Sequence, residues 1–194
     1  MPRRDSPSIS ARTLTEAQDR FIAAWGQMGS TWGISRTMAE IHALLYITNA
    51  PLNTDDVMER LEISRGNASM SLRALVDWGI VSKVHRRGDR KEYFHAEQDV
   101  WTMLKQVIRE RLRREVQPVL ASLFEIRDLT THNAPPPTLP AGEPAAEPDA
   151  VRTHNTRLDA LTDLLTTIDK LGERFVGSEG KSLQLAASIL SKIP

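Results

Sequence analysis

Apolar residues recur every three or four positions in the first part of the chain, which is the spacing of one face of an α-helix. The first stripe predicts a helix from Thr13 to about Trp32, with the inward positions Leu14, Ala17, Phe21, Ala24, Trp25, Met28 and Trp32. A second helix is predicted from about Ser35 to Thr48, because Pro51 disfavours helical geometry in the residue before it. Its inward positions are Met38, Ile41, Leu44 or Leu45, and Ile47.

Three glycines, Gly26, Gly29 and Gly33, fall on the first predicted helix or just after it. Glycine weakens an isolated helix by about 1 kcal/mol relative to alanine. We therefore expect these positions to be places where another backbone packs closely.

Two short helices follow. The first is expected to begin at the N-cap Asn53, with Asp55 and Asp56 in its first turn, where carboxylates complement the helix dipole. The second is expected to begin at Ser64 and to end before Gly79. Its apolar face carries Ala68, Leu72, Leu75 and Val76; the opposite face carries Gly66, Asn67, Met70 and Arg73, with Arg65 and Ser69 at its flanks.

The runs "IVSKVHR" and "KEYFHA" favour β-strands, and "RGDR" between them predicts a hairpin with Gly-Asp at its tip. A long helix should follow over residues 99–129, kinked or broken at Pro118. Residues 133–148 hold six of the 11 prolines, which is typical of a semi-rigid linker. Two further amphipathic helices are predicted, over residues 158–175 and 183–193.

The composition is that of an ordinary soluble protein, with 40% hydrophobic and 26% charged residues. The sequence contains no cysteine, which excludes disulfides, thiolate metal sites and a Cys nucleophile. The N-terminal segment lacks the apolar run of a secretory signal, and no apolar stretch is long enough to cross a membrane. We therefore expect a cytoplasmic protein with no membrane partner.

Charge is balanced overall, with 25 basic and 25 acidic residues, but it is unevenly placed. Residues 60–91 contain three acids, Glu62, Asp77 and Asp89, against eight basic residues: Arg60, Arg65, Arg73, Lys83, Arg86, Arg87, Arg90 and Lys91. One positive region on a neutral protein indicates an anionic partner at one face.

A helix, a short turn, a second helix and a basic hairpin are the order of a winged helix-turn-helix, in which the second helix enters the major groove of DNA and the hairpin lies against the adjacent backbone or minor groove. Tyr93 and Phe94 should return one side of the hairpin to the core. The predicted DNA-binding residues are Ser64, Arg65, Asn67, Ser69, Met70, Arg73, Lys83, Arg86, Arg87, Arg90 and Lys91.

Other interpretations of this pattern remain open. A charge run between strands is often a solvated turn, and exposed Arg or Ser residues are often ordinary surface. A winged helix can also be a protein-interaction module, or an architectural DNA binder without sequence preference. What favours a DNA-binding domain is the order and adjacency of the capped helices, the glycine stop and the basic hairpin.

The segment "LEISRGNASMSLRALVDWGIVSKVHRRGDRKEYF" resembles the MarR-type winged-helix transcriptional regulators, and the N-terminal "WGQMGSTWGISRTMAEIHALLYI" is similar to the opening signature of their GbsR-like branch. The resemblance covers roughly residues 13–125. It implies a homodimeric regulator, generally a repressor, that binds an inverted repeat through a recognition helix (Ser64–Trp78) and a wing (Val84–Phe94). The Pro-rich segment fits the family pattern poorly.

The expected fold is mostly α with a small β-hairpin wing, a winged helix-turn-helix with flanking dimerisation helices. We expect a flexible N-terminus (residues 1–12), the DNA-binding domain with its N-terminal helix (13–98) and a long connecting and dimerisation helix (99–132). A Pro-rich linker (133–150) and C-terminal dimerisation helices (151–194) should follow. Apolar stripes beyond the DNA-binding part favour interchain packing, although an intrachain core would also bury them.

Trp25 and Trp32 lie seven residues apart, on one face, and Tyr46 lies on the next helix. Aromatic rings hold quaternary ammonium groups by cation–π attraction, and some GbsR-like regulators are associated with choline or glycine betaine metabolism. The three residues are therefore candidate effector-binding residues, although Trp at helical spacing is more often part of a core.

No catalytic or metal-binding pattern stands out. The five histidines (His42, His85, His95, His132 and His154) lack ligand spacing, and the glycines do not form a phosphate loop after a strand. We expect no enzyme activity, no cofactor and no metal.

Overall fold

The computed structural model describes residues 9–131 and 147–177. The chain forms two compact units, divided after Met103. Most of the predicted Pro-rich segment and the whole of the last predicted helix (183–193) lie outside the described residues.

Helix α1 (Ala11–Thr31) begins at Ser10, whose hydroxyl accepts a hydrogen bond from the Thr13 N–H (3.1 Å). It packs against α2 (Arg36–Thr48) through Gly26 and Gly29, which are buried. A Cβ atom on Gly29 would lie 2.5 Å from the Ala39 Cβ atom, and one on Gly26 would lie 2.6 Å from the Cγ atom of Glu40. The close approach expected at these two glycines is confirmed, but at Gly33 the expectation is wrong: no atom lies within 4 Å of an added Cβ there, and the residue has φ +74° just after α1.

The apolar stripe predicted for α1 is not its buried face. Leu14 and Trp32 are 47% and 55% exposed, and Phe21, Trp25 and Met28 are half-buried. The helix is rotated so that the row of Ile22, Gly26 and Gly29 meets α2, because small residues let the two backbones come closest. The same correction holds for Ile47 on α2, which is exposed, whereas Leu44 and Leu45 are both buried.

The helix-turn-helix consists of α3 (Thr54–Leu61) and α4 (Arg65–Asp77). Both predicted N-caps are confirmed: the Asn53 side chain accepts from the N–H groups of Asp55 and Asp56, and the Ser64 hydroxyl accepts from that of Asn67. Gly79, with φ +72°, follows the C-terminus of α4. The predicted apolar face of α4 is buried at Ala68, Leu72 and Leu75, and α4 packs against α2.

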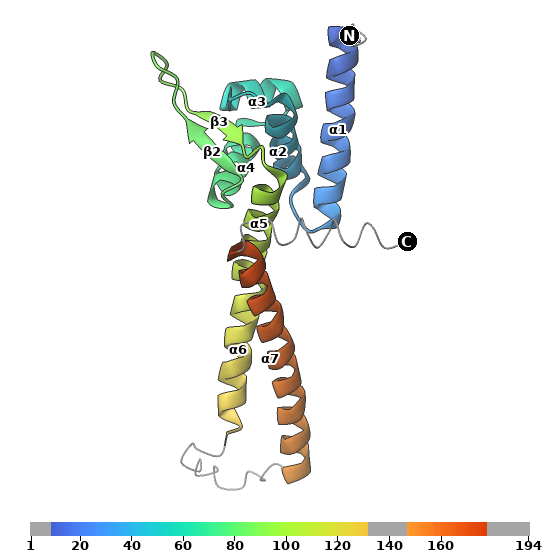
Figure 1. Cartoon of the computed structure of the whole chain (residues 1–194), viewed down its shortest axis with the longest axis vertical. Coiled ribbons are helices and arrows are strands. Elements are labelled where there is room, and N and C mark those ends of the chain that lie inside the picture. The colour runs from blue at the N-terminus through green and yellow to red at the C-terminus, as the bar shows by residue number, and fades with distance from the viewer. Residues whose placement is uncertain (1–8, 132–146, 178–194) are drawn as a thin grey trace, which may run out of the picture. The chain divides into compact units, whose positions relative to one another are not determined.

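The wing belongs to a three-stranded antiparallel sheet in the order β1-β3-β2. Strand β2 (Val81–Val84) pairs with β3 (Tyr93–Ala96), and Figure 1 shows the hairpin projecting from the helices of its unit. Tyr93 and Phe94 are buried, as predicted. Strand β1 (Leu52–Asn53), which the sequence pattern did not predict, pairs with β3.

The strands of the wing are shorter than the sequence predicts. Strand pairing ends at Val84 and Tyr93, but the predicted turn at the tip is present: the Asp89 N–H donates to the Arg86 carbonyl (3.1 Å), and Gly88 has φ +87°. Between the paired strands and the tip, Arg86 and Lys91 turn their side chains back toward the body of the domain.

The unit boundary lies within α5 (Val100–Arg111). A π-helical turn, η1 (Leu112–Val116), separates α5 from α6 (Gln117–Leu129) just before Pro118. The Gln117 N–H reaches Leu112, five residues back. Proline has no N–H to donate to the carbonyl four residues earlier and clashes with it, so a wider turn is the expected accommodation. The predicted interruption of the long helix is confirmed.

Helix α7 (Pro148–Gly177) lies beside α6 in the second unit (Figure 1). Arg127 on α6 forms an ion pair with Asp159 (2.7 Å), and Gly172 lies directly against the side chain of Leu112. Large apolar side chains nevertheless stay exposed on both helices, namely Val119, Phe124, Ile126, Leu129, Leu161, Leu164, Ile168 and Leu171.

Candidate nucleic-acid interface

Helix α4 presents the polar face that the sequence predicts. Arg65, Asn67, Met70 and Arg73 are exposed, and Ser69 is half-buried. Ser64 caps the helix, and the Arg73 Nε–H donates to the backbone carbonyl of Ser69 (3.2 Å). The face therefore combines short polar groups and one flexible apolar group with a cation at each end.

Arg86 is held at the base of the wing. Its guanidinium group lies over the ring of Tyr93, 4.1 Å from the ring centroid, and donates to the carbonyl of Pro51 (3.0 Å). The Tyr93 hydroxyl donates to Asp89 (2.7 Å), and the Lys91 backbone N–H donates to the other oxygen of Asp89 (2.9 Å). These two bonds lower the pKa of Asp89, the Tyr93 bond being the larger cause. The wing loop is thus ordered by its own side chains.

The predicted cations of the wing differ in what they contact. Lys83 pairs with Glu92 on the opposite side of the hairpin (2.9 Å), and Arg86 and Lys91 are bound back to the domain. Arg87 and Arg90, near the tip, are exposed and form no ion pair or side-chain hydrogen bond with any of the described residues. The tip therefore offers two cations available to an external anion.

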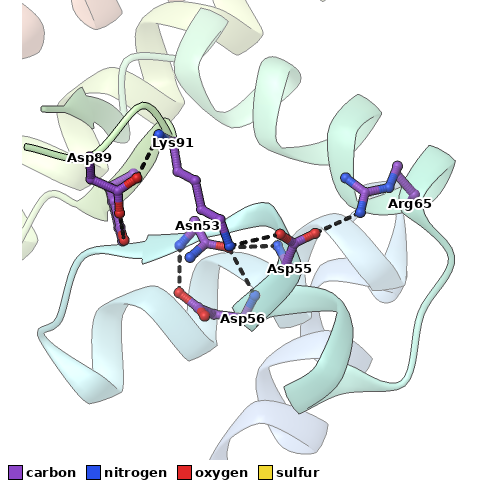
Figure 2. A network of polar contacts seen from close by, with 7 residues as sticks. Asn53, Asp55, Asp56, Arg65, Asp89 and Lys91 are labelled. Carbon is purple, nitrogen blue, oxygen red and sulfur yellow. Dashed lines mark hydrogen bonds and ion pairs between the residues drawn. The ribbon is translucent and has the colours of Figure 1, made fainter. Parts of the chain in front are cut away.

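Asp55 connects the two parts of the interface (Figure 2). Its Oδ1 atom accepts from Arg65 Nη2 (2.6 Å), and its Oδ2 atom accepts from Lys91 Nζ (3.1 Å). Hydrogen bonds from Lys91, first, and then Arg65 lower the pKa of Asp55, and Asp55 in turn raises the pKa of Lys91. The carboxylate thus joins the start of α4 to the wing.

The sequence pattern predicts Asp55 only as a first-turn carboxylate of its helix. The contact with Lys91 spans 36 positions and the contact with Arg65 spans ten, so no local pattern could reveal them. One weaker feature of the sequence could have indicated this role of Asp55. The residue lies in the first turn of the helix that precedes the polar-faced helix, just outside the most basic part of the chain.

Two of the three candidate effector residues, Trp25 and Tyr46, lie beside a buried histidine. His42 on α2 is buried, with its ring between those of Trp25 (6.1 Å between centroids) and Tyr46 (6.2 Å). Burial lowers the pKa of His42 from 6.5 to about 4, and its Nε2 atom has no hydrogen-bond partner within residues 9–131 and 147–177. Since His42 fills the space between Trp25 and Tyr46, only their remaining faces could contact a ligand. Trp32 follows the last residue of α1.

Within the described ranges, 9–131 and 147–177, the chain offers neither a metal site nor a membrane span. No group of three or more His, Cys, Asp or Glu residues there could hold a metal ion. No helix there is long and apolar enough to span a bilayer.

Comparison with known proteins shows regulators of one family. The MarR family model matches residues 32–92. The chain is 26% identical over 121 residues to the HTH-type transcriptional repressor GbsR of Bacillus subtilis (strain 168), a match that covers 62% of this chain and 66% of GbsR. It is 23% identical to the HTH-type transcriptional repressor OpcR of the same organism, over 55% of this chain and 65% of OpcR.

The matches thus span just under two thirds of the length of both relatives. A solved structure described as a transcriptional regulator aligns with a TM-score of 0.56 at 18% identity, covering 83% of this chain and 96% of that one. This likeness supports the winged-helix fold. The matched relatives carry the names of transcriptional regulators and not of enzymes. The motifs, the fold and these matches agree in making the chain similar to MarR-type regulators, and among them to GbsR and OpcR.

Proposed function

We propose that this protein binds duplex DNA in a sequence-specific manner and regulates transcription as a homodimer on an inverted repeat. The observation that carries the proposal is the continuity of one polar and basic surface. The exposed face of α4 and the wing cations lie on neighbouring elements that Asp55 connects. Side chains such as Arg65 and Asn67 suit the edges of bases in the major groove, whereas the arginines of the tip suit phosphates or the minor groove.

Two features support a dimer. A single winged helix neutralises few phosphates and so binds weakly and with strong salt dependence, whereas two linked copies multiply the affinity. The chain also carries apolar surface that its described residues do not cover, on α1 at Leu14 and on α6 and α7 at positions such as Leu129, which is 84% exposed. Apolar surface of this kind is typical of protein interfaces.

Repression is the direction of control that we propose, since both relatives above carry the name repressor. Binding of the operator would then block transcription, and deletion of the gene would raise expression of its targets. Action on chromosomal DNA also implies the cytoplasmic location that the sequence predicts.

Control by a small effector of the quaternary amine class remains part of the proposal. The partial exposure of Trp25 and Tyr46 supports it, because aromatic rings attract cations; Phe21 packs beside both rings, with centroids 5.6 Å and 6.5 Å away. Titration of the tryptophan fluorescence with choline tests it directly. A saturable change that a Trp25→Leu variant lacks would support an effector site there, and no change at millimolar choline would remove it.

The decisive experiment for DNA binding is selection of bound sequences from a random duplex pool. Recovery of an inverted repeat, bound by two subunits, is the expected result. An architectural DNA binder would select no sequence and would be displaced equally by random competitor DNA. A protein-interaction module would bind neither the selected pool nor random DNA with salt-dependent affinity.

A further inference from the structure

We propose that Asp55 is a positioning residue for sequence discrimination: it fixes the guanidinium group of Arg65 relative to the wing and thereby sets how α4 reads bases. The inference rests on the proposed DNA-binding function and assigns a role within it. Asp55 was not among the residues predicted to bind DNA.

Asp55 is itself firmly held. Its backbone N–H donates to the Asn53 side chain (2.8 Å), within a capping box in which the Asn53 N–H donates to Asp56 (2.9 Å). Asn53 also belongs to β1 and is paired with Tyr93 of β3, one of the two strands that form the wing. The carboxylate is therefore attached to the root of the wing through main-chain and side-chain contacts, and it provides a fixed reference point for Arg65 (Figure 2).

Stability does not account for this arrangement. The side chains of Asp55, Arg65 and Lys91 are 48%, 67% and 54% exposed, and ion pairs between exposed groups contribute little to the free energy of folding. A carboxylate beside a surface that meets phosphates also weakens binding to any DNA, because it offsets a nearby cation. What the contact provides is orientation of a side chain that would otherwise sample many rotamers.

Arg65 keeps most of its hydrogen-bonding capacity while Asp55 holds it. A guanidinium group has five N–H donors in a rigid fork, and the structure gives Asp55 a single hydrogen bond from Nη2. The remaining donors can form the bidentate contact with a guanine edge that arginine makes in the major groove. A guanidinium fixed in direction meets one base position, whereas a free one can turn to a phosphate instead.

Asp55→Asn tests this role, because it preserves size and the backbone cap but removes the charge. Affinity for the selected operator and for a scrambled duplex is measured for the full chain across a range of salt. We expect the variant to bind scrambled DNA more tightly than wild type, and its ratio of specific to non-specific affinity to fall about tenfold. Glu59→Gln, which removes the same charge one turn further along α3, should leave that ratio unchanged.

A double-variant cycle separates positioning from a general structural effect. If Asp55 acts through Arg65, then Asp55→Asn should cost no further discrimination once Arg65→Ala is present, and thermal unfolding should show all variants folded. An unchanged ratio in Asp55→Asn, or an equal loss in both backgrounds, overturns the inference while the DNA-binding function stands. Absence of DNA binding by the wild-type protein overturns the proposed function itself, and this inference with it.

Discussion

Single side chains of the wing differ in what they can offer to DNA. Arg86 is bound between the Tyr93 ring and the carbonyl of Pro51, so its first role is to shape the hairpin. Arg87 and Arg90 are exposed near the tip, without an ion pair to any described residue, and so need not break an internal contact to meet a phosphate. The five wing cations that the sequence groups together therefore have unequal roles.

Arg87→Ala and Arg90→Ala should weaken binding to specific and random duplexes by similar factors. Each substitution removes one phosphate contact per subunit, so the slope of log affinity against log salt should become shallower by about 2 for a dimer. Filter binding or fluorescence anisotropy at several salt concentrations measures this slope. A change in sequence preference with an unchanged salt slope would contradict this assignment.

His42 should make stability depend on pH. Its pKa in the folded protein, about 4, lies below the ordinary value of 6.5, so the unfolded chain takes up the proton first. The contribution of His42 to the free energy of unfolding is fully present above pH 6.5, the ordinary pKa. It is lost as the pH falls from there toward the folded pKa, by up to about 3 kcal/mol.

His42→Phe keeps a ring between Trp25 and Tyr46 but cannot titrate. Urea unfolding near pH 7 and near pH 5 should therefore show a smaller loss of stability in the variant than in the wild type, by about 1–2 kcal/mol. Carboxylates titrate in both proteins and cancel in the comparison. Equal losses would mean that His42 is not the titrating group.

The sequence predicted those residue properties that depend on near neighbours. The caps Asn53 and Ser64 follow from local hydrogen bonding, and the exposure of Arg65 follows from the helical period of α4. Asp55 could not be assigned in this way, since its partners come from two other elements. The inward turn of Arg86 depends on Pro51, 35 positions earlier, and is equally non-local.

At the scale of elements, helices were predicted well and strands less well. The periods of α2 and α4 are long enough to define them. Helix α7 begins at Pro148, ten residues before the predicted start and within the predicted linker (133–150), because its first turns carry no apolar stripe. Strand β1 has two residues and exists only because β3 lies beside it. The buried face of α1 was predicted wrongly for a similar reason, because it depends on a neighbouring element. Hydrophobic periodicity points to the largest side chains, but the contact with α2 is made through glycines, which contribute no apolar signal.

Gly29→Ala should destabilise the protein by about 1–3 kcal/mol, because the new methyl group would overlap the Ala39 Cβ atom and force α1 away from α2. Gly66→Ala is the matched control: it lies on α4 with open space around the added carbon. Since alanine favours helix over glycine, the control should be neutral or stabilising by up to about 1 kcal/mol. Chemical denaturation of both variants measures the difference. Equal effects would show that α1 does not depend on the close approach.

At the scale of the whole molecule, the uncovered apolar surface of the second unit is the feature that the described chain does not explain by itself. Val119 and Phe124 on α6, and Leu164 and Leu171 on α7, are about half exposed. A dimer interface would bury such side chains and would bring two winged helices to one operator. The oligomeric state and the salt dependence of DNA binding are then linked.

Leu164→Glu should shift the protein from dimer to monomer. A buried leucine contributes about 2 kcal/mol, and a symmetric interface contains it twice, so the dimer dissociation constant should rise at least tenfold. Sedimentation equilibrium should give a mass of twice 21.7 kDa for the wild type and a concentration-dependent lower mass for the variant. Because a monomer carries half the phosphate contacts, the variant should also bind the operator with about half the salt slope.

Lys170→Glu, at an exposed polar position of the same helix, controls for added negative charge. It should leave the mass at that of the dimer, since it places no charge in an apolar contact. If both variants remain dimers with the wild-type salt slope, the apolar face around Leu164 is not what joins the subunits. If both dissociate alike, charge and not the loss of apolar contact is responsible. Dissociation of the leucine variant alone, with half the salt slope, is the outcome that ties α7 to DNA binding through the dimer.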